Sequence, residues 1–270
     1  MTMNSGATAA KEVSSIILTE NDFEASLRAV MWGRNIFHNI SRFIQFQVTV
    51  NISALVTIFV GIIVFSNSPL NAVQLLWINL IMDTFAALSL STEPPLKQVI
   101  KGKPYTDDMS ILTLTVRGQI YLISLWNIIV MMLLMFCGKA VGGLDYERST
   151  DPYSTCQDLT SSKCTQGEDK RRHFTYIYNT FVFLQMFNMI NCRKIGRRDF
   201  NVFESFFHNS YFLFLFVFIF VIQFVQCQYS PFNDITNTVP LERSEWGSCI
   251  AVGSTSLLIS ATIKLIPDEM

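Results

Sequence analysis

NAVQLLWINLIMDTFAALSLS, residues 71–91, is apolar enough to cross a membrane, yet it carries a carboxylate, Asp83, past its midpoint. About 20 helical residues span about 30 Å, which is the thickness of the hydrocarbon core of a bilayer. An ionised side chain at that depth costs roughly 2.5–3.5 kcal/mol on insertion scales. No cationic residue lies one turn away, so Asp83 must face a bundle interior, a water-filled cavity or a cation. The stretch therefore predicts a membrane bundle with a polar or ion-binding interior.

The composition of the whole chain indicates an integral membrane protein. Half of the 270 residues are hydrophobic and 15% are charged, whereas a soluble domain carries about 25% charged residues. This composition predicts a lipid bilayer as partner. The formal net charge of −1 lacks the excess of positive charge that binds phosphates, so we expect no nucleic acid as partner. The polar opening lacks the charged and apolar regions of a cleaved signal peptide.

Six apolar blocks have the length of a membrane span. The fold class predicted from them is an all-α membrane protein, a bundle of six transmembrane helices with a short cytosolic amino-terminal piece and a stalk helix. The fourth block is the most polar, since it carries Asn179, Gln185, Asn188 and Asn191. The predicted helices are about 45–65, 71–91, 116–138, 173–192, 209–229 and 246–266.

The distribution of Lys and Arg predicts that both termini are cytosolic. With six spans the two termini share a side, and the loops on that side hold 13 of the 20 Lys and Arg residues. The loop 139–172 is then extracytosolic, where an oxidising compartment permits a disulfide between Cys156 and Cys164. Two free thiols remain the alternative. The other four cysteines are interpreted as packing residues: Cys137, Cys192, Cys227 and Cys249.

The amino-terminal part divides in two. Residues 1–20 are small and polar and end in an apolar run, Ile16 to Leu18, that is typical of a strand. Residues 21–44 place apolar side chains at helical spacing and run without interruption into the first span. We interpret 21–44 as an amphipathic stalk helix, with a helix lying in the lipid headgroups as the alternative, and 45–270 as the transmembrane domain.

Asp83 and Asn79 are the candidate ion ligands. Asn79 lies four residues before Asp83, which predicts that both occupy one face of the helix. A carboxylate and an amide oxygen suit a hard cation such as Ca²⁺ or Mg²⁺; the alternative is a protonated Asp83 hydrogen-bonded with Asn79 across helices. Asn51 in the first span and Gln185 in the fourth are accessory polar candidates. One mid-membrane carboxylate cannot neutralise two divalent ions, so we predict a single ion completed by ligands from elsewhere.

The chain contains none of the common signatures of catalysis. No phosphate-binding loop, dinucleotide fingerprint, zinc-protease motif or nucleophile elbow occurs. We therefore assign no catalytic residue to this chain.

Several long motifs resemble the carboxyl-terminal membrane region of P-type calcium-transporting ATPases, above all the plasma-membrane, calmodulin-regulated (type IIB) group. They occur in the same order as in that family and cover nearly the whole chain, least well in 139–172. They are MTMNSGATAAKEVSSIILTENDF, MWGRNIFHNISRFIQFQVTVNISAL, WINLIMDTFAALSLSTEPP and NTFVFLQMFNMINCRKIGRRDFNVFESFFHN.

The resemblance implies a pump driven by an aspartyl phosphate, of which this chain holds helices five to ten. It implies that Asn79 and Asp83 bind Ca²⁺ together with a glutamate of the fourth helix, outside this chain. In the family's two-calcium members a second ion is bound by residues at the positions of Asn51, Ala54 and Gln185. Those members have glutamates at the last two of these positions, where this chain has the uncharged residues Ala54 and Gln185. Residues 1–20 are implied to end the phosphorylation domain.

The resemblance also implies cofactors and partners. Mg²⁺ and ATP would be bound by the parent protein outside this chain, and the amino-terminal half of the pump would be a partner. Calmodulin is implied by the group, but no basic amphipathic tail follows the last span. The plasma membrane is the implied location, with an endomembrane or vacuole as alternatives.

We therefore interpret the chain as the carboxyl-terminal half of an ATP-driven Ca²⁺ export pump that forms most of one mid-membrane Ca²⁺ site. The first alternative is a truncated, non-catalytic membrane module that assembles with or regulates a full pump. The second is a secretory-pathway Ca²⁺/Mn²⁺ pump, which shares the Asn-x-x-x-Asp spacing, and the third is a passive cation pathway lined by Asp83.

Overall fold

The chain is almost entirely helical in the computed structural model, which describes residues 1–19, 22–65, 68–93, 95, 111–142, 162–193 and 209–264. The predicted all-α membrane class is confirmed, because among these residues the only strands are a two-residue parallel pair. The elements in chain order are β1 (Thr2–Met3), α1 (Thr8–Val13), β2 (Ile17–Leu18), α2 (Phe23–Phe65), α3 (Ala72–Trp77), the π-helix η1 (Ile78–Met82), α4 (Asp83–Ser91), α5 (Leu114–Gly142), α6 (Ser162–Cys192), α7 (Ser210–Gln228), α8 (Phe232–Thr236) and α9 (Arg243–Lys264).

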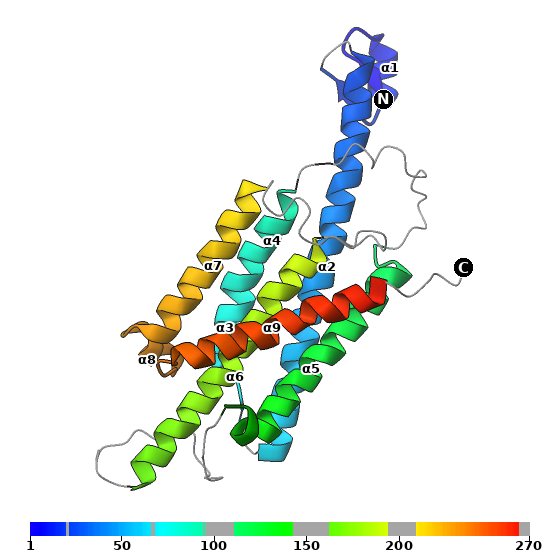
Figure 1. Ribbon diagram of the computed structural model, residues 1–270. Helices are drawn as coiled ribbons and strands as arrows, with labels where there is room; N and C mark the ends of the chain where they lie inside the picture. Colours follow the sequence, from blue (N-terminus) through cyan, green and yellow to red (C-terminus); the bar gives the residue numbers. More distant parts are fainter. Residues whose placement is uncertain are drawn as a thin grey trace.

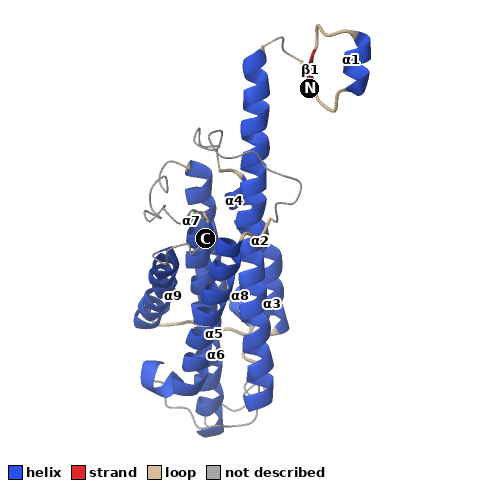
Figure 2. Cartoon of the chain, turned by 90° about the vertical axis from the view of Figure 1, so that its right-hand side faces the viewer, coloured by secondary structure: helices blue, strands red, loops and turns tan. Residues whose placement is uncertain are grey.

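Helix α2 is the longest element and extends well beyond the bundle (Figures 1 and 2). Its 43 residues correspond to about 65 Å, twice the thickness of a bilayer core. Its first buried residue is Asn35, so the preceding turns form the protruding part that carries α1 and the β1–β2 pair. The strand predicted at Ile16–Leu18 is β2.

The stretch 71–91 forms one span that is interrupted at its centre. Asn71 caps the start of α3 through a reciprocal capping box with Gln74. The helix then widens into η1, where the N–H of Asp83 donates to the carbonyl of Ile78, five residues back. The hydroxyl of Thr84 donates to the carbonyl of Leu80. A π turn inside an α-helix is often found at functional sites, and the sequence pattern alone did not predict it.

Helix α6 is the central helix of the bundle. From His173 to Arg193 every side chain is buried except those of Phe174 and Phe187, which are half-buried. Helices α2, α5 and α9 pack against it, and α7 contacts it through a hydrogen bond from Gln223 to Asn179. A helix enclosed by protein does not need a lipid-facing surface, which explains how α6 can carry so many amides.

Four of the six predicted spans lie in helices that are long and apolar enough to cross a membrane: Glu24–Val64, Ala72–Ser91, Leu114–Phe136 and Ser210–Gln228. The other two lie in α6 and α9, which are helices of sufficient length but do not reach the same apolarity among the described residues. In α6 the amides lower the hydropathy, and they are enclosed by neighbouring helices. The count of six spans stays a prediction. Helix α6 also begins at Ser162, earlier than the predicted 173.

Contacts along their length hold α6 and α9 together, and α9 crosses α6 in Figure 1. At one end Arg172 forms ion pairs with Glu242 and Glu245, at 2.9 and 2.8 Å. Near the other end Asn191 donates to the carbonyl of Ser256. Between them the backbone of Gly253 approaches α6 so closely that an added Cβ would lie 2.9 Å from the Cβ of Phe183.

The close approach at Gly253 predicts that Gly253→Ala destabilises the bundle. The new methyl group would also lie 3.1 Å from the backbone of Phe183, so the helices must separate, at a cost of about 1–3 kcal/mol. Thermal unfolding of the purified chain in detergent measures this loss. Gly247→Ala is the matched control on the same helix, since nothing lies within 4 Å of its added Cβ. An equal melting temperature for the two variants would contradict the packing account.

Candidate ion-binding site

Asp83 is a buried carboxylate at the point where the π turn becomes α4. Only 5% of its surface is exposed, and its backbone N–H is used by the bond to Ile78. Among the described residues no cluster of three His, Cys, Asp or Glu side chains exists that would hold a metal ion. A cation bound at Asp83 would therefore need neutral oxygens, or groups from outside the described residues, as its other ligands.

Gln47 of α2 is the hydrogen-bond partner of Asp83. Its Nε2 donates to Oδ2 of Asp83 at 2.7 Å, within the range of a charge-assisted bond. Oδ1 of Asp83 is buried and has no hydrogen-bond partner among the described residues. A hydrogen bond to a charged group contributes about 1.5–3 kcal/mol, against roughly 2.5–3.5 kcal/mol for inserting the carboxylate. One bond offsets much of that cost but leaves one oxygen available to a cation, a proton or water.

Asn79 lies in η1, four residues before Asp83, but the two side chains differ in burial. Asn79 is exposed, whereas Asp83 faces the bundle. Because the span is apolar, an exposed amide there suits a surface that is covered by protein rather than by lipid. No described element covers Asn79.

The structure joins Asp83 to α2 rather than to Asn79. The cross-helix hydrogen bond of Asp83 is therefore made with Gln47 and not with Asn79. The sequence gives only a weak indication of this role, because a glutamine in a long helix can face a neighbouring helix, a cavity or the surface.

The accessory candidates lie apart from this bond. Asn51 is exposed on α2, and the neighbouring Ala54 is 6% exposed. Gln185 on α6 is fully buried, and neither its Oε1 nor its Nε2 has a hydrogen-bond partner among the described residues. Within the described ranges neither Asn51 nor Gln185 hydrogen-bonds to Asp83.

The predicted disulfide lies outside what the structure describes. Cys156 is not among the described residues, and nothing is described of the side chain of Cys164 in α6. Three of the cysteines interpreted as packing residues, Cys192, Cys227 and Cys249, are buried and form no disulfide, which agrees with that interpretation.

Comparison with known proteins identifies relatives along nearly the whole chain. Residues 67–266 match the family described as "Cation transporting ATPase, C-terminus". Over 267 residues, 98% of the chain, the sequence is 38% identical to plasma membrane calcium-transporting ATPase 2 of Oreochromis mossambicus and 39% identical to plasma membrane calcium-transporting ATPase 3 of Homo sapiens. The match with plasma membrane calcium-transporting ATPase 4 of Bos taurus is 37% over the same length. These alignments cover 22%, 20% and 20% of the relatives, so the chain spans about a fifth of their length.

The bond between Gln47 and Asp83 predicts that Gln47→Leu lowers thermal stability. The buried carboxylate would lose its donor, which costs about 1–3 kcal/mol, measurable as a lower melting temperature of the purified chain in detergent. Asn51→Leu is the control one turn further along α2, because Asn51 is exposed and the described residues include no hydrogen-bond partner for it. A Gln47→Leu variant as stable as the control would show that the bond contributes nothing.

Proposed function

The chain belongs to the family of the carboxyl-terminal region of cation-transporting ATPases, and from this we propose that it forms most of a single mid-membrane Ca²⁺ site in an ATP-driven Ca²⁺ export pump. The observation that carries the proposal is the buried Asp83, which has one oxygen bonded to Gln47 and the other without a partner among the described residues. The relatives named as plasma membrane calcium-transporting ATPases support Ca²⁺ as the cargo.

Asp83 supplies the negative charge of the proposed site. Gln47 holds Oδ2, so the carboxylate keeps one orientation while Oδ1 binds the ion. When Ca²⁺ leaves, a proton on the carboxylate removes the cost of a bare charge in the membrane. The same group can therefore carry Ca²⁺ in one direction and a proton in the other.

Asn79 supplies a neutral oxygen from the exposed side of η1. Ca²⁺ takes six to eight oxygen ligands, more than Asp83 and Asn79 provide. The open surface around Asn79 suits a further helix of the parent pump that contributes the missing ligands, including a second carboxylate. The π turn supports this role, because it widens the helix where Asn79 and Asp83 must present oxygens to one ion.

The remaining assignments follow from the proposed pump. Residues 1–20 end its phosphorylation domain, and 21–44 is the stalk that leads into the transmembrane domain, 45–270. ATP and Mg²⁺ bind to parts of the parent outside this chain. Both termini are cytosolic, the membrane is the plasma membrane, and Cys156 and Cys164 form an extracytosolic disulfide.

The role of Asp83 as the charged ligand predicts that Asp83→Asn abolishes high-affinity Ca²⁺ uptake in a complete pump. The substitution keeps shape and a carbonyl oxygen but removes the charge that a divalent ion needs. ATP-dependent ⁴⁵Ca²⁺ uptake into vesicles, normalised to the amount of pump in the membrane, is the measurement. Normal uptake by this variant would refute the ligand role.

The single-ion proposal makes a separate prediction about Ala54. Ala54→Glu alone should not create a second ion site, because Gln185 stays neutral and one added carboxylate cannot balance another divalent ion. The ratio of Ca²⁺ transported to ATP hydrolysed should stay near one in both the unmodified pump and the variant. A ratio near two in the unmodified pump would contradict the single site.

A further inference from the structure

A cluster of charged residues lies where α4 ends, ten positions after Asp83. Glu93 accepts from Nη1 of Arg42 at 2.6 Å through Oε2 and from Nη2 of Arg193 at 3.3 Å through Oε1. Arg42 belongs to α2, and Arg193 directly follows α6. The side chain of Glu93 is 14% exposed. One acidic side chain thus connects the span that contains Asp83 to two other helices.

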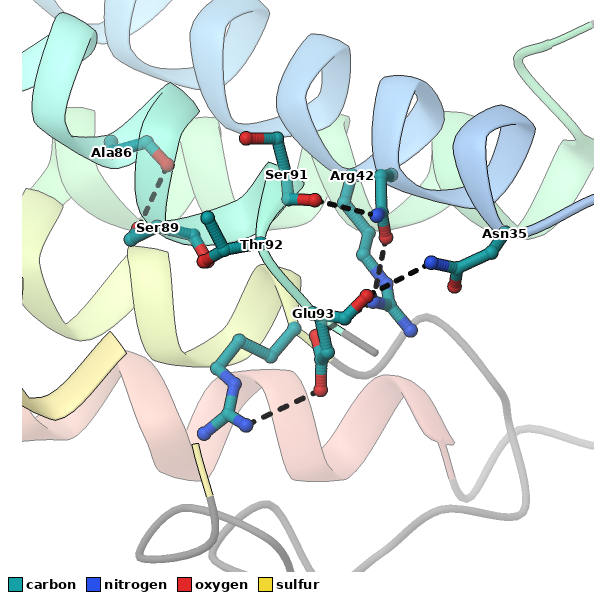
Figure 3. A network of polar contacts seen from close by, with 9 residues as sticks. Asn35, Arg42, Ala86, Ser89, Ser91, Thr92 and Glu93 are labelled. Atoms are coloured by element: carbon teal, nitrogen blue, oxygen red, sulfur yellow. Dashed lines mark hydrogen bonds and ion pairs between the residues drawn. The ribbon is translucent and has the colours of Figure 1, made fainter. Parts of the chain in front are cut away.

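The backbone at this end of α4 is bound to α2 as well. The last carbonyls of an α-helix have no partner within the helix. Here Nδ2 of Asn39 donates to the carbonyl of Ser91 at 3.1 Å, and Nδ2 of Asn35 donates to the carbonyl of Glu93 at 2.9 Å. Figure 3 shows this group of contacts around Glu93. These bonds from the stalk add to the local turn at Thr92, whose N–H donates to the carbonyl of Leu88.

The contact on the side of α6 is deeply buried. The side chain of Arg193 is 2% exposed, and its guanidinium lies 4.2 Å from the centre of the Phe212 ring of α7. Removing one partner of a buried ion pair leaves the other charge without compensation, which makes such a pair strongly dependent on geometry. Arg193 therefore fixes Glu93 relative to α6 and α7.

Helix α4 is bound to α2 at both of its ends. At its start Gln47 bonds Asp83, and at its finish Asn39 and Arg42 bond Ser91 and Glu93. About 12 Å of helix separates Asp83 from Ser91. An α-helix of that length moves as a rigid body, so a displacement of α2 at the level of Arg42 carries Asp83 with it.

We propose that Glu93 is a positioning residue that couples movement of the stalk α2 to the ion site at Asp83. It does so by holding the end of α4 between Arg42 and Arg193. The inference rests on the proposed pump function and adds a residue that does not touch the ion. Without the carboxylate, α4 loses its common link to α2 and α6, and the movement of Asp83 follows that of α2 less closely.

The test is the Ca²⁺ dependence of ATP-driven uptake by a complete pump that carries Glu93→Gln. We expect the maximal rate to fall by about 3- to 30-fold, with the half-saturating Ca²⁺ concentration unchanged within about twofold, because the ligands remain. The Glu93→Gln, Arg193→Gln double variant should be no slower than the slower single variant, since both remove the same link. An unchanged maximal rate, or additive losses in the double variant, would overturn the proposal.

Arg28→Gln is the matched control on the same helix. Arg28 pairs with Asp22 at 3.8 Å with both side chains about half exposed, and exposed pairs contribute little, so the variant should transport normally. An equal loss in Arg28→Gln would overturn the proposal, because it would mean that any lost stalk charge slows the pump. If Glu93→Gln does not reach the membrane, Glu93→Asp serves instead. It keeps the charge but is too short to bridge both guanidinium groups, and an unchanged maximal rate would again count against the link.

Asp83→Asn in the same assay separates the two proposals. If Asp83→Asn abolishes uptake while Glu93→Gln transports like the unmodified pump, the coupling role fails and the ion site stands. If Asp83→Asn transports normally, the proposed ion site fails whatever Glu93→Gln does, and the coupling proposal, which rests on it, is overturned with it.

Discussion

The structure depends on one costly feature, a carboxylate buried in a helix that must be apolar to cross a membrane. Gln47 donates a hydrogen bond to one oxygen of Asp83. That bond offsets only part of the free energy needed to insert the carboxylate, and the other oxygen has no hydrogen-bond partner among the described residues. The bond also contributes to the packing, because it places Gln47 of α2 and Asp83 of the interrupted span at the same level. The π turn widens the backbone directly before Asp83, where a straight α-helix would have been the more stable local choice. These features motivate the proposal of a site that alternates between two occupants, a divalent ion and a proton.

The bundle around Asp83 separates surfaces that face lipid from surfaces that face protein. Helix α7 carries a nearly continuous apolar sequence and exposes Phe214, Phe218 and Phe224, as expected for a helix in contact with lipid. Helix α6 has the opposite arrangement, since its amides are enclosed by α2, α5, α7 and α9. Each of the six apolar blocks lies in a helix, but α6 is less apolar than a lipid-exposed span because it carries amides that are enclosed by protein. The apolarity that a membrane helix needs depends on whether its side chains face lipid or other helices, and tertiary packing decides which they face.

The candidate site was predictable in part. A lone acid in an apolar stretch drew attention to Asp83 without any structure, since its energetic cost can be read from one residue and its neighbours. The partner of that acid could not be predicted in the same way. Gln47 lies in a different helix, and the register between two helices cannot be deduced from the sequence of either one. The spacing of Asn79 and Asp83 suggested a common face, but the structure buries one and exposes the other. The contacts among Glu93, Arg42 and Arg193 could not be predicted for the same reason: in the sequence, Glu93 and Arg193 are ordinary helix-end charges and Arg42 is an ordinary charge of the stalk.

Helix α2, the span 71–91 and α6 meet at Glu93, while α2 and this span meet again at Asp83. Through these two connections, movement of α2 would be transmitted by the short helix α4 to the carboxylate of Asp83. This movement matters for transport if the carboxylate binds the transported ion. The position of that ion in an experimental structure of the complete, Ca²⁺-loaded pump tests this most directly. We expect ion density about 2.3–2.6 Å from Oδ1 of Asp83, with Gln47 still bonded to Oδ2. Density elsewhere in the bundle, with Asp83 in contact only with Gln47, would contradict it.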